Sequence, residues 1–294
     1  MDKEQQAIKR IQTASEMSFK LTGEPLLFTD SGGKDSAVIC KLAENAHIPF
    51  EIVHSHTTAD APETVMHVRE RAKQYEANGI KYTIDYPFYK GKPVSMWSLI
   101  PQKVMPPTRP VRYCCDVLKE HSMPGKVIVT GVRWAESAKR ANTRNVYEIQ
   151  SKDKEKRVFA GDNAENRTLF ESCYQTGKRV VNPIIDWQDN DVWDYIADQK
   201  IKVNPLYYSG FCRVGCIGCP MAGKHRYEEF ARYPKYMNLY INSFARMLDK
   251  RREKGMKVVW FTAEDVFHWW MEDGIMSGQV KIDEVEEANG NNNT

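Results

Sequence analysis

The sequence predicts an α/β fold, in which a doubly wound and mainly parallel sheet is followed by a C-terminal helical extension. Three observations lead to this prediction. Short apolar runs, typical of buried parallel strands, alternate with segments in which apolar residues recur at helical spacing. A glycine-rich turn at residues 31–36 joins the first apolar run to the helix that follows it. Between residues 224 and 274, the pattern is that of two or three helices.

Four segments are expected along the chain. Residues 1–23 form an N-terminal amphipathic helix, and residues 24–225 form the nucleotide-binding α/β domain, which also carries the cysteines described below. Residues 226–278 form the helical C-terminal region. Residues 279–294 are rich in acidic residues and asparagine, and we expect a disordered tail there.

Within the α/β domain, each expected element follows from its local pattern. Strands are predicted to begin at Leu26 and to cover residues 50–55, 82–84 and 126–131. Helices are predicted after the glycine turn, over residues 63–78 and 188–196, and from the residues after Asp116 to His121. The proline-rich segment 86–110 is expected to be irregular. Residues 150–179 are rich in charge and asparagine, and residues 151–157 within them are expected to form a solvated hairpin or insertion.

Composition limits the classes of protein that the chain can represent. The 294 residues are 41% hydrophobic, which is enough for a substantial core. No apolar run approaches the roughly 20 residues that span a bilayer, and the N-terminus lacks the apolar core of a signal peptide. We therefore expect a cytoplasmic protein with no membrane partner. The seven cysteines, an odd number with two adjacent, favour metal or redox chemistry over a disulfide framework.

The glycine turn has the composition of an anion-binding loop. Gly32 and Gly33 allow several backbone N–H groups to point at one phosphate beside the positive end of the following helix. The hydroxyls of Ser31 and Ser36 add donors, and Lys34 adds a positive charge. The spacing differs from that of a Walker A loop. It resembles instead the PP-loop of ATP pyrophosphatases, which implies ATP cleavage between the α and β phosphates with the loop holding the pyrophosphate. Asp35 suits either Mg²⁺ binding or fixing of the turn.

Further polar residues follow the carboxyl ends of predicted strands, the edge at which doubly wound sheets bind ligands. Thr57 follows the second strand, and Gly131 ends the strand over residues 126–131. Arg133 and Arg140 come shortly after that strand, where two guanidinium groups suit an anion. A solvated basic turn is the alternative for the arginines.

Four cysteines form the second candidate site. Cys216 and Cys219 are spaced as Cys-x-x-Cys, and Cys114 and Cys115 are adjacent. Together they supply four thiolates, enough for zinc or for a [4Fe-4S] cluster, and adjacent cysteines fit the larger cluster better because their sulfurs diverge. Buried apolar cysteines and a strained vicinal disulfide are the alternatives. Cys212 is a further candidate ligand, whereas Cys173 has no partner at metal spacing.

Several motifs, in this order along the chain, resemble the phosphoadenosine phosphosulfate (PAPS) reductase family of the PP-loop ATP pyrophosphatase superfamily. The resemblance covers roughly residues 25–225. The motifs are Ser31–Ser36, Ala61–Thr64, Cys114–Cys115, Thr130–Arg133 with Ser137 and Arg140, Asn182–Trp187 with Asp191–Trp193, Asn204–Tyr207 and Gly215–Cys219. It implies an adenine nucleotide alpha hydrolase-like fold. The paired cysteines are similar to the iron–sulfur branch, which implies a [4Fe-4S] cluster on Cys114, Cys115, Cys216 and Cys219, with Arg133 and Arg140 facing the nucleotide's anionic end.

Two departures from the family's reductases shape the functional expectation. The chain has no cysteine after Cys219, whereas those reductases attack sulfur with a cysteine near the carboxyl end. Its glycine loop also keeps the ATP-cleaving form. We therefore expect an enzyme that uses ATP and Mg²⁺ to adenylate an acceptor, releases pyrophosphate and serves sulfur transfer, with Lys34, Asp35, Arg133 and Arg140 as catalytic residues. The alternatives are an adenylyl-sulfate or PAPS reductase using an external thiol, and a non-catalytic iron–sulfur protein that binds nucleotide or nucleic acid.

The expected partners follow from this reading. They are an adenine nucleotide, a sulfur donor such as a protein persulfide or sulfide, and a second copy of the chain in a homo-oligomer. Residues 233–254 are expected to form a helix that ends in Lys250, Arg251, Arg252 and Lys254. This basic end is either a nucleic-acid surface or an ordinary cationic helix terminus, which the helix dipole favours.

Overall fold

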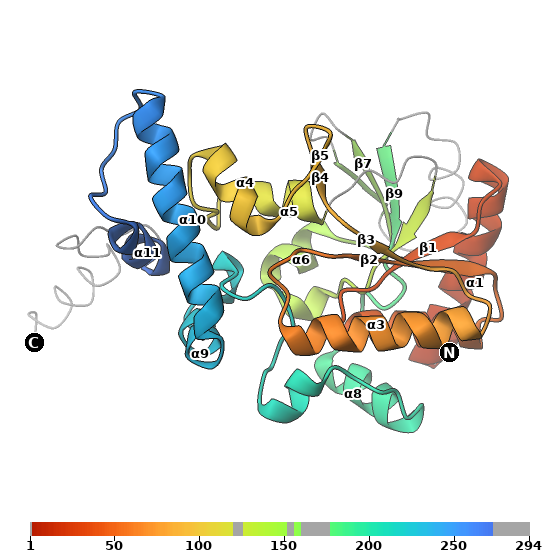
Figure 1. Cartoon of the computed structure of the whole chain (residues 1–294). Helices are drawn as coiled ribbons and strands as arrows, with labels where there is room; N and C mark the ends of the chain where they lie inside the picture. Colours follow the sequence, from red (N-terminus) through yellow and green to blue (C-terminus); the bar gives the residue numbers. More distant parts are fainter. Residues whose placement is uncertain (1, 120–125, 152–155, 160–176, 273–294) are drawn as a thin grey trace, which may run out of the picture. The chain divides into compact units, whose positions relative to one another are not determined.

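The computed structural model describes residues 2–119, 126–151, 156–159 and 177–272 (Figure 1). Contacts divide the chain into two compact units. The first, called the sheet unit, comprises residues 1–56, 61–85 and 121–215, and the second, called the cysteine unit, comprises residues 57–60, 86–120 and 216–294.

This division differs from the expected boundaries in two ways. The N-terminal helix belongs to the sheet unit rather than standing alone, and the four candidate cysteine ligands belong to the second unit together with the C-terminal helices. The reason is that the segment after residue 85 and the segment after residue 215 pack on each other. Cys173 and the expected tail at residues 279–294 lie outside the described residues.

A seven-stranded sheet forms the centre of the sheet unit, in the order β3-β2-β1-β6-β9-β7-β8. The strands β3, β2, β1, β6 and β9 are parallel, while β7 runs antiparallel to both β9 and β8. The bounds are β1 Leu26–Thr29, β2 Phe50–Ser55, β3 Tyr82–Asp85, β6 Val127–Val129, β7 Tyr147–Ser151, β8 Lys156–Phe159 and β9 Gly177–Val181. The chain proceeds outward from β1 to β3 and then returns to β6 on the other side of β1, which makes the β1–β6 boundary a topological switch point. This confirms the predicted doubly wound, mainly parallel sheet.

The helices of the sheet unit have the bounds α1 Lys3–Thr22, α2 Lys34–Asn45, α3 Pro62–Ala77, α6 Ala138–Thr143 and α8 Asp189–Asp198, with short 3₁₀ turns η1 Trp134–Glu136 and η2 Pro205–Ser209. Helix α2 packs against both α1 and α8. Apolar residues at helical spacing, such as Ile11 in α1 and Val38 in α2, are fully buried beside strand residues such as Phe28. The predicted pattern of alternating strands and helices is therefore the pattern that buries the core.

The cysteine unit contains the hairpin β4 Phe88–Tyr89 and β5 Lys92–Pro93, the helices α4 Met96–Lys103, α5 Tyr113–Leu118, α9 His225–Arg232, α10 Pro234–Glu253 and α11 Ala263–Met271, and the turn η3 Pro220–Ala222. The expectation of an irregular segment at residues 86–110 was wrong, because α4 lies within it. Ser95 caps this helix by accepting a bond from the backbone N–H of Ser98, and α4 packs against α10 (Figure 1). Among the described helices, none is both long and apolar enough to cross a membrane.

Candidate functional site: a glycine loop and a cysteine pocket

The glycine loop lies between β1 and α2, at the switch point of the sheet. Gly32 has φ +74°, a conformation that side chains disfavour, and a Cβ there would lie 2.9 Å from Thr64 Cγ2. Gly33 is the N-cap residue of α2. Gly32 thus lets the chain turn from the strand into the helix, as the sequence predicted, whereas Gly33, at φ −97°, has an extended conformation that any residue adopts.

The carboxylate of Asp30 holds the glycine loop in place by hydrogen bonds, a role that was not predicted from the sequence. Its buried carboxylate accepts hydrogen bonds from the Gly32 amide at 2.8 Å, the Ser36 hydroxyl at 3.0 Å and the Tyr82 hydroxyl at 2.7 Å. The guanidinium of Arg71 lies 3.3 Å away. Burial alone would raise the pKa of Asp30, but the charge of Arg71 and these hydrogen bonds hold it below its usual range. Asp30 is therefore an ionised carboxylate that fixes the loop.

The loop presents backbone amides at the N-terminus of α2. The first bond of this helix runs from the Ala37 amide to the Gly33 carbonyl at 3.1 Å, so the amides of Lys34, Asp35 and Ser36 have no intrahelical acceptor. The amide of Lys34 donates instead to the Tyr207 hydroxyl at 3.0 Å. Together with the positive end of the helix dipole, these amides provide the anion cradle that the composition predicted.

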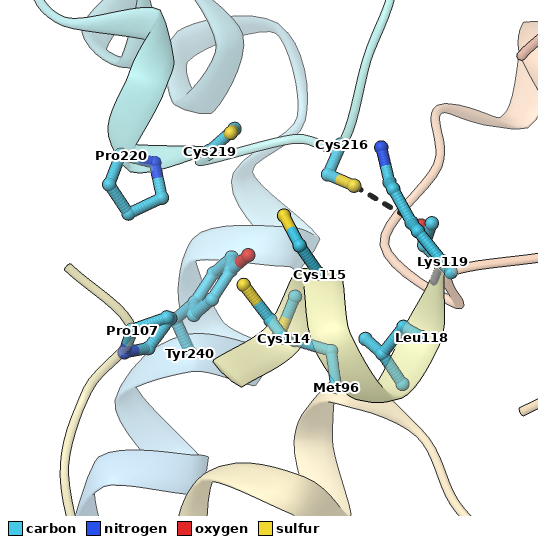
Figure 2. Close-up of a pocket in the computed structure, with 11 residues that line it drawn as sticks. Met96, Pro107, Cys114, Cys115, Leu118, Lys119, Cys216, Cys219, Pro220 and Tyr240 are labelled. Carbon is cyan, nitrogen blue, oxygen red and sulfur yellow. Dashed lines mark hydrogen bonds between the residues drawn. The ribbon is translucent and has the colours of Figure 1, made fainter. Parts of the chain in front are cut away.

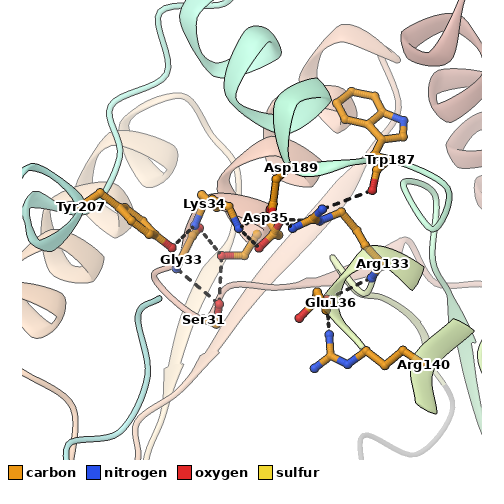
Figure 3. Close-up of polar contacts among 11 residues, drawn as sticks. Ser31, Gly33, Lys34, Asp35, Arg133, Glu136, Arg140, Trp187, Asp189 and Tyr207 are labelled. Carbon is orange, nitrogen blue, oxygen red and sulfur yellow. Dashed lines mark hydrogen bonds and ion pairs between the residues drawn. The ribbon is translucent and has the colours of Figure 1, made fainter. Parts of the chain in front are cut away.

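Four charged side chains form a closed network beside these amides (Figure 3). Arg133 donates from Nε to Asp35 Oδ1 and from Nη2 to Asp189 Oδ1, both at 2.7 Å. Lys34 Nζ lies 3.1 Å from Asp35 Oδ2 and 3.4 Å from Asp189 Oδ1. The hydrogen bond from Arg133 and the nearby charge of Lys34 hold the pKa of Asp189 below its usual value. The network joins three of the four predicted catalytic residues, and Asp189 is a member that the sequence analysis missed.

Three predicted site residues have other contacts. Arg140, the fourth predicted catalytic residue, is 39% exposed and forms an ion pair with Glu136. The Glu136 carboxylate also accepts from the backbone N–H of Arg133, so Arg140 lies next to the side-chain network without belonging to it (Figure 3). Gly131 lies against the start of α2, where a Cβ would be 2.9 Å from the backbone carbon of Asp35, so its role is close packing. Thr57 belongs to the cysteine unit, where its hydroxyl lies 3.3 Å from Cys216 Sγ.

A pocket in the cysteine unit is lined by all four predicted metal ligands (Figure 2). Helix α5 carries Cys114 and Cys115, and Cys216 and Cys219 lie on the turn before η3. The cavity volume is about 30 Å³, more than the roughly 10–15 Å³ that one water needs. The remaining lining residues are Thr57, Met96, Pro107, Leu118, Lys119, Pro220 and Tyr240.

Buried aromatic residues hold the Cys-x-x-Cys turn. A Cβ on Gly218 would lie 2.5 Å from Phe230 Cζ, so the turn packs directly on the aromatic core of the unit. The carboxylate of Glu229 accepts a 2.7 Å bond from the Gly218 amide, and the Tyr240 hydroxyl donates to the Ile217 carbonyl at 2.9 Å. These contacts fix the direction in which the two cysteines leave the turn.

The donor set is chemically suited to a metal cofactor, and its sulfurs are not gathered around a single-ion position. Among the described residues, no three of these four sulfurs lie within 4.8 Å of one another. A single tetrahedral zinc would hold its sulfurs about 3.8 Å apart, given a Zn–S bond of about 2.3 Å. Burial raises the pKa of Cys216 to about 11, so its thiol is neutral at pH 7 and a metal would have to displace the proton.

The cysteines outside this pocket differ in their surroundings. Cys212 is exposed, belongs to the sheet unit and is not among the residues that line the pocket. Cys40 is buried in α2, where burial raises its pKa far above the usual range, as expected for a packing residue.

The basic end of α10 is largely engaged in packing. Arg251 donates to the Val104 carbonyl at 2.8 Å, and its guanidinium lies 5.6 Å from the centre of the Trp260 ring. Lys250 and Arg252 form ion pairs with Glu253 and Asp249. These contacts favour the interpretation of an ordinary cationic helix terminus.

A glycine loop beside helical amides that have no intrahelical acceptor, placed at the switch point of a parallel sheet, defines a nucleotide-binding α/β protein. The family model of the phosphoadenosine phosphosulfate reductase domain matches residues 25–222. The chain belongs to this family, and its sheet is the doubly wound, mainly parallel sheet that the sequence predicted.

Relatives include uncharacterized proteins as well as enzymes. A protein of Methanocaldococcus jannaschii is 30% identical over 227 residues, which are 74% of this chain and 46% of that protein. Sulfate adenylyltransferase subunit 2 of Methylobacterium nodulans is 31% identical over 60% of this chain and 56% of its own length. Adenosine 5'-phosphosulfate reductase of Allochromatium vinosum is 23% identical over 68% of this chain and 69% of its own length. The chain spans about half the length of the first curated relatives it matches.

Among solved structures, the U34-tRNA thiolase NcsA of Methanococcus maripaludis with its [4Fe-4S] cluster aligns with a TM-score of 0.42. The sequence identity is 14%, and the alignment covers 85% of this chain and 82% of that one.

Proposed function

We propose that the chain is an ATP pyrophosphatase-type enzyme, which adenylates an acceptor, releases pyrophosphate and serves sulfur transfer. The observation that carries the proposal is the intact loop at residues 31–36, whose helical amides lie beside Lys34 and Arg133. Amides and fixed cations in this arrangement match the charge that develops on a departing pyrophosphate. The proposed substrate is therefore ATP, bound with Mg²⁺.

The loop's own groups supply positioning and charge neutralisation. An acceptor oxygen attacks the α phosphorus, the bond from that phosphorus to the oxygen bridging the α and β phosphates breaks, and pyrophosphate leaves with the bonding electrons. The amides of Asp35 and Ser36 donate to the departing phosphates, and Lys34 offsets their negative charge. Arg133 acts through Asp35 because its side chain is only 1% exposed and is fully engaged by carboxylates and the Trp187 carbonyl. A sulfur nucleophile then displaces AMP from the adenylated acceptor.

For the cysteine pocket, we propose a [4Fe-4S] cluster on Cys114, Cys115, Cys216 and Cys219. A cubane of this kind, when bound, supplies a site that binds or delivers sulfur or that adjusts local charge. The support is the set of four cysteine sulfurs that line one cavity. Thr57 orients the Cys216 sulfur through its hydroxyl.

A second candidate is an adenylyl-sulfate or PAPS reductase that uses an external thiol. It is favoured by the relationship to the adenosine 5'-phosphosulfate reductase of Allochromatium vinosum. The two candidates differ in their substrate: the first cleaves ATP, while the second releases sulfite from a sulfonucleotide in a thiol-dependent reaction.

The test is to incubate the full chain, purified anaerobically, with Mg²⁺-ATP and candidate acceptors, and to measure pyrophosphate and AMP. We expect acceptor-dependent pyrophosphate release, which Lys34→Ala strongly reduces. The matched control is Lys41→Ala on the same helix. Lys41 does not belong to the loop, and its ammonium group lies 2.7 Å from the Glu44 carboxylate. Release of inorganic phosphate in place of pyrophosphate would contradict the proposal, and rapid sulfite release from adenylyl sulfate would favour the reductase.

A further inference from the structure

The hydroxyl of Tyr207 lies at the anion cradle, although the sequence analysis assigned no role to this residue. It accepts the hydrogen bond from the Lys34 amide at 3.0 Å, and it lies 3.4 Å from the position that a Cβ of Gly33 would occupy (Figure 3). The Ser31 hydroxyl lies on the same glycine, accepting from its amide at 3.3 Å. The hydroxyls of Ser31 and Tyr207, which are far apart in the sequence, thus both lie at the turn whose amides are proposed to bind an anion.

The surrounding structure holds Tyr207 in this place. Asn204 begins η2 and is fully buried, and its side-chain amide donates to the Gly32 carbonyl at 3.1 Å and to the Thr64 hydroxyl at 3.0 Å. The Tyr207 ring packs edge-on against Trp193 of α8, with the ring centres 5.3 Å apart. The position of the Tyr207 side chain is therefore fixed by the packing of its ring and by the contacts of η2 with the loop.

The hydroxyl has a proton to donate. Burial raises the pKa of Tyr207 to about 12, so the phenol stays protonated at neutral pH. Its oxygen already accepts from Lys34, and within the described part of the chain no group accepts the hydroxyl proton. This half-buried donor, beside the amides of Asp35 and Ser36, is available to donate to an anionic oxygen.

We propose that Tyr207 is a phosphate-binding residue. Its hydroxyl oxygen accepts from the Lys34 amide, and its hydroxyl proton is donated to an oxygen of the pyrophosphate group. This inference rests on the proposed function, because it assigns the loop to the β and γ phosphates of ATP. It makes the cradle a composite of loop amides and a side chain that arrives from η2, 173 positions further along the chain. The competing interpretation is that the hydroxyl occupies the place of a phosphate oxygen and has to be displaced.

Calorimetric titrations of the full chain with pyrophosphate, ATP and AMP test the proposal. Tyr207→Phe keeps the ring that packs on Trp193 and removes the hydroxyl. We expect it to weaken the binding of pyrophosphate and ATP about 10-fold or more, the usual effect of losing a hydrogen bond to a charged group. Binding of AMP, which lacks the β and γ phosphates, should be unchanged. The matched control is Tyr208→Phe, because Tyr208 is 78% exposed.

The outcomes separate this inference from the proposed function. Unchanged pyrophosphate binding by Tyr207→Phe would overturn the inference, as would an equal loss of AMP binding, and tighter binding would show that the hydroxyl obstructs the site. A wild-type protein that binds neither ATP nor pyrophosphate would overturn the proposed function as well. A second measurement needs no variant: pyrophosphate should protect Tyr207, but not Tyr208, from acetylation by N-acetylimidazole, as read by mass spectrometry of peptides. Equal acetylation with and without bound pyrophosphate would also overturn the inference.

Discussion

Arg133 donates a 2.7 Å hydrogen bond from Nε to Asp35 Oδ1, across 98 positions of sequence. The other oxygen of Asp35 lies 3.1 Å from the ammonium group of Lys34. Both oxygens of this carboxylate are therefore engaged by cations of the protein. Of the two roles that the sequence left open for Asp35, this geometry favours fixing the turn over binding Mg²⁺.

Asp189 competes with an anionic ligand for the ammonium group of Lys34, which leads to the first prediction. Its side chain is 67% exposed, and it contacts both Arg133 and Lys34. We expect Asp189→Asn to tighten pyrophosphate binding about 2- to 5-fold in the absence of Mg²⁺, the size of effect that an exposed charge has. Calorimetry at two salt concentrations checks this, because added salt should shrink the difference.

The control for this prediction is Asp194→Asn, which removes an exposed charge from the same helix, α8. It should leave pyrophosphate binding unchanged. Weaker binding by Asp189→Asn would mean that the carboxylate orients the two cations for the ligand instead of competing with it.

The second prediction concerns Gly32. Gly32→Ala places a Cβ where φ is +74° and only 2.9 Å from Thr64, whereas Gly23→Ala meets a similar φ of +71° with nothing within 4 Å. Backbone strain should cost each variant about 1–2 kcal/mol of unfolding free energy. The overlap in Gly32→Ala should cost about 1–3 kcal/mol more. Urea unfolding measures both, and pyrophosphate binding should suffer in Gly32→Ala alone. Equal losses of stability would show that the loop relaxes around the added methyl group.

The third prediction is a pH dependence of stability from His67. This residue of α3 is 3% exposed, and burial lowers its pKa to about 4, from an ordinary value near 6.5. Between pH 6.5 and pH 4, His67 is therefore protonated in the unfolded chain and neutral in the folded chain. The free energy of unfolding therefore has its full value, as far as His67 is concerned, above pH 6.5, and it falls by up to about 3 kcal/mol as the pH is lowered toward 4.

Unfolding free energies measured from pH 7 to pH 4 check this prediction. His67→Leu should have a shallower pH dependence than the wild type over this interval. His47→Asn serves as the control, since His47 is exposed and asparagine tolerates its φ of +53°. Parallel curves for the wild type and His67→Leu would argue against the buried neutral imidazole.

The fourth prediction concerns the cofactor. Anaerobically prepared protein should be brown and carry about four irons per chain if the four pocket cysteines hold a cubane. Cys216→Ser should lose iron and colour because Cys216 lines the pocket. Cys212→Ser should keep both, since Cys212 is exposed and is not among the lining residues. One equivalent of zinc without iron, measured by metal analysis after anaerobic reconstitution, would contradict the cluster.

The elements that the sequence predicted well are those with local signals. The strands at Leu26 and Phe50 are short apolar runs, and the helix at Pro62 begins with a residue that suits a first helical turn. Helix α4 was missed because Pro101 lies inside it and prolines surround it, while its start depends on the reciprocal hydrogen bonds of Ser95 and Ser98. Proline counts thus predicted an irregular segment where a capped helix forms.

The site shows the same limit. The loop glycines, Lys34 and Arg133 were expected because each has a local motif. Asp189 and Tyr207 are 56 and 173 positions away from the groups they contact. Tyr207 belongs to one of the family motifs, but no local pattern indicates that either side chain reaches the glycine loop. The role of Asp30 could have been predicted from its position. A carboxylate immediately before a glycine turn is well placed to accept a hydrogen bond from an amide of the turn. Such contacts depend on tertiary packing, which local patterns do not encode.

The charge network of Lys34, Asp35, Arg133 and Asp189 contains two cations and two anions, so its formal sum is zero. A nucleotide with several negative charges therefore meets no surplus of protein charge to balance it. The balance has to come with the ligand, as a divalent cation. Nucleotide and cation should then bind with positive cooperativity, and by thermodynamic linkage each should raise the affinity for the other by the same factor.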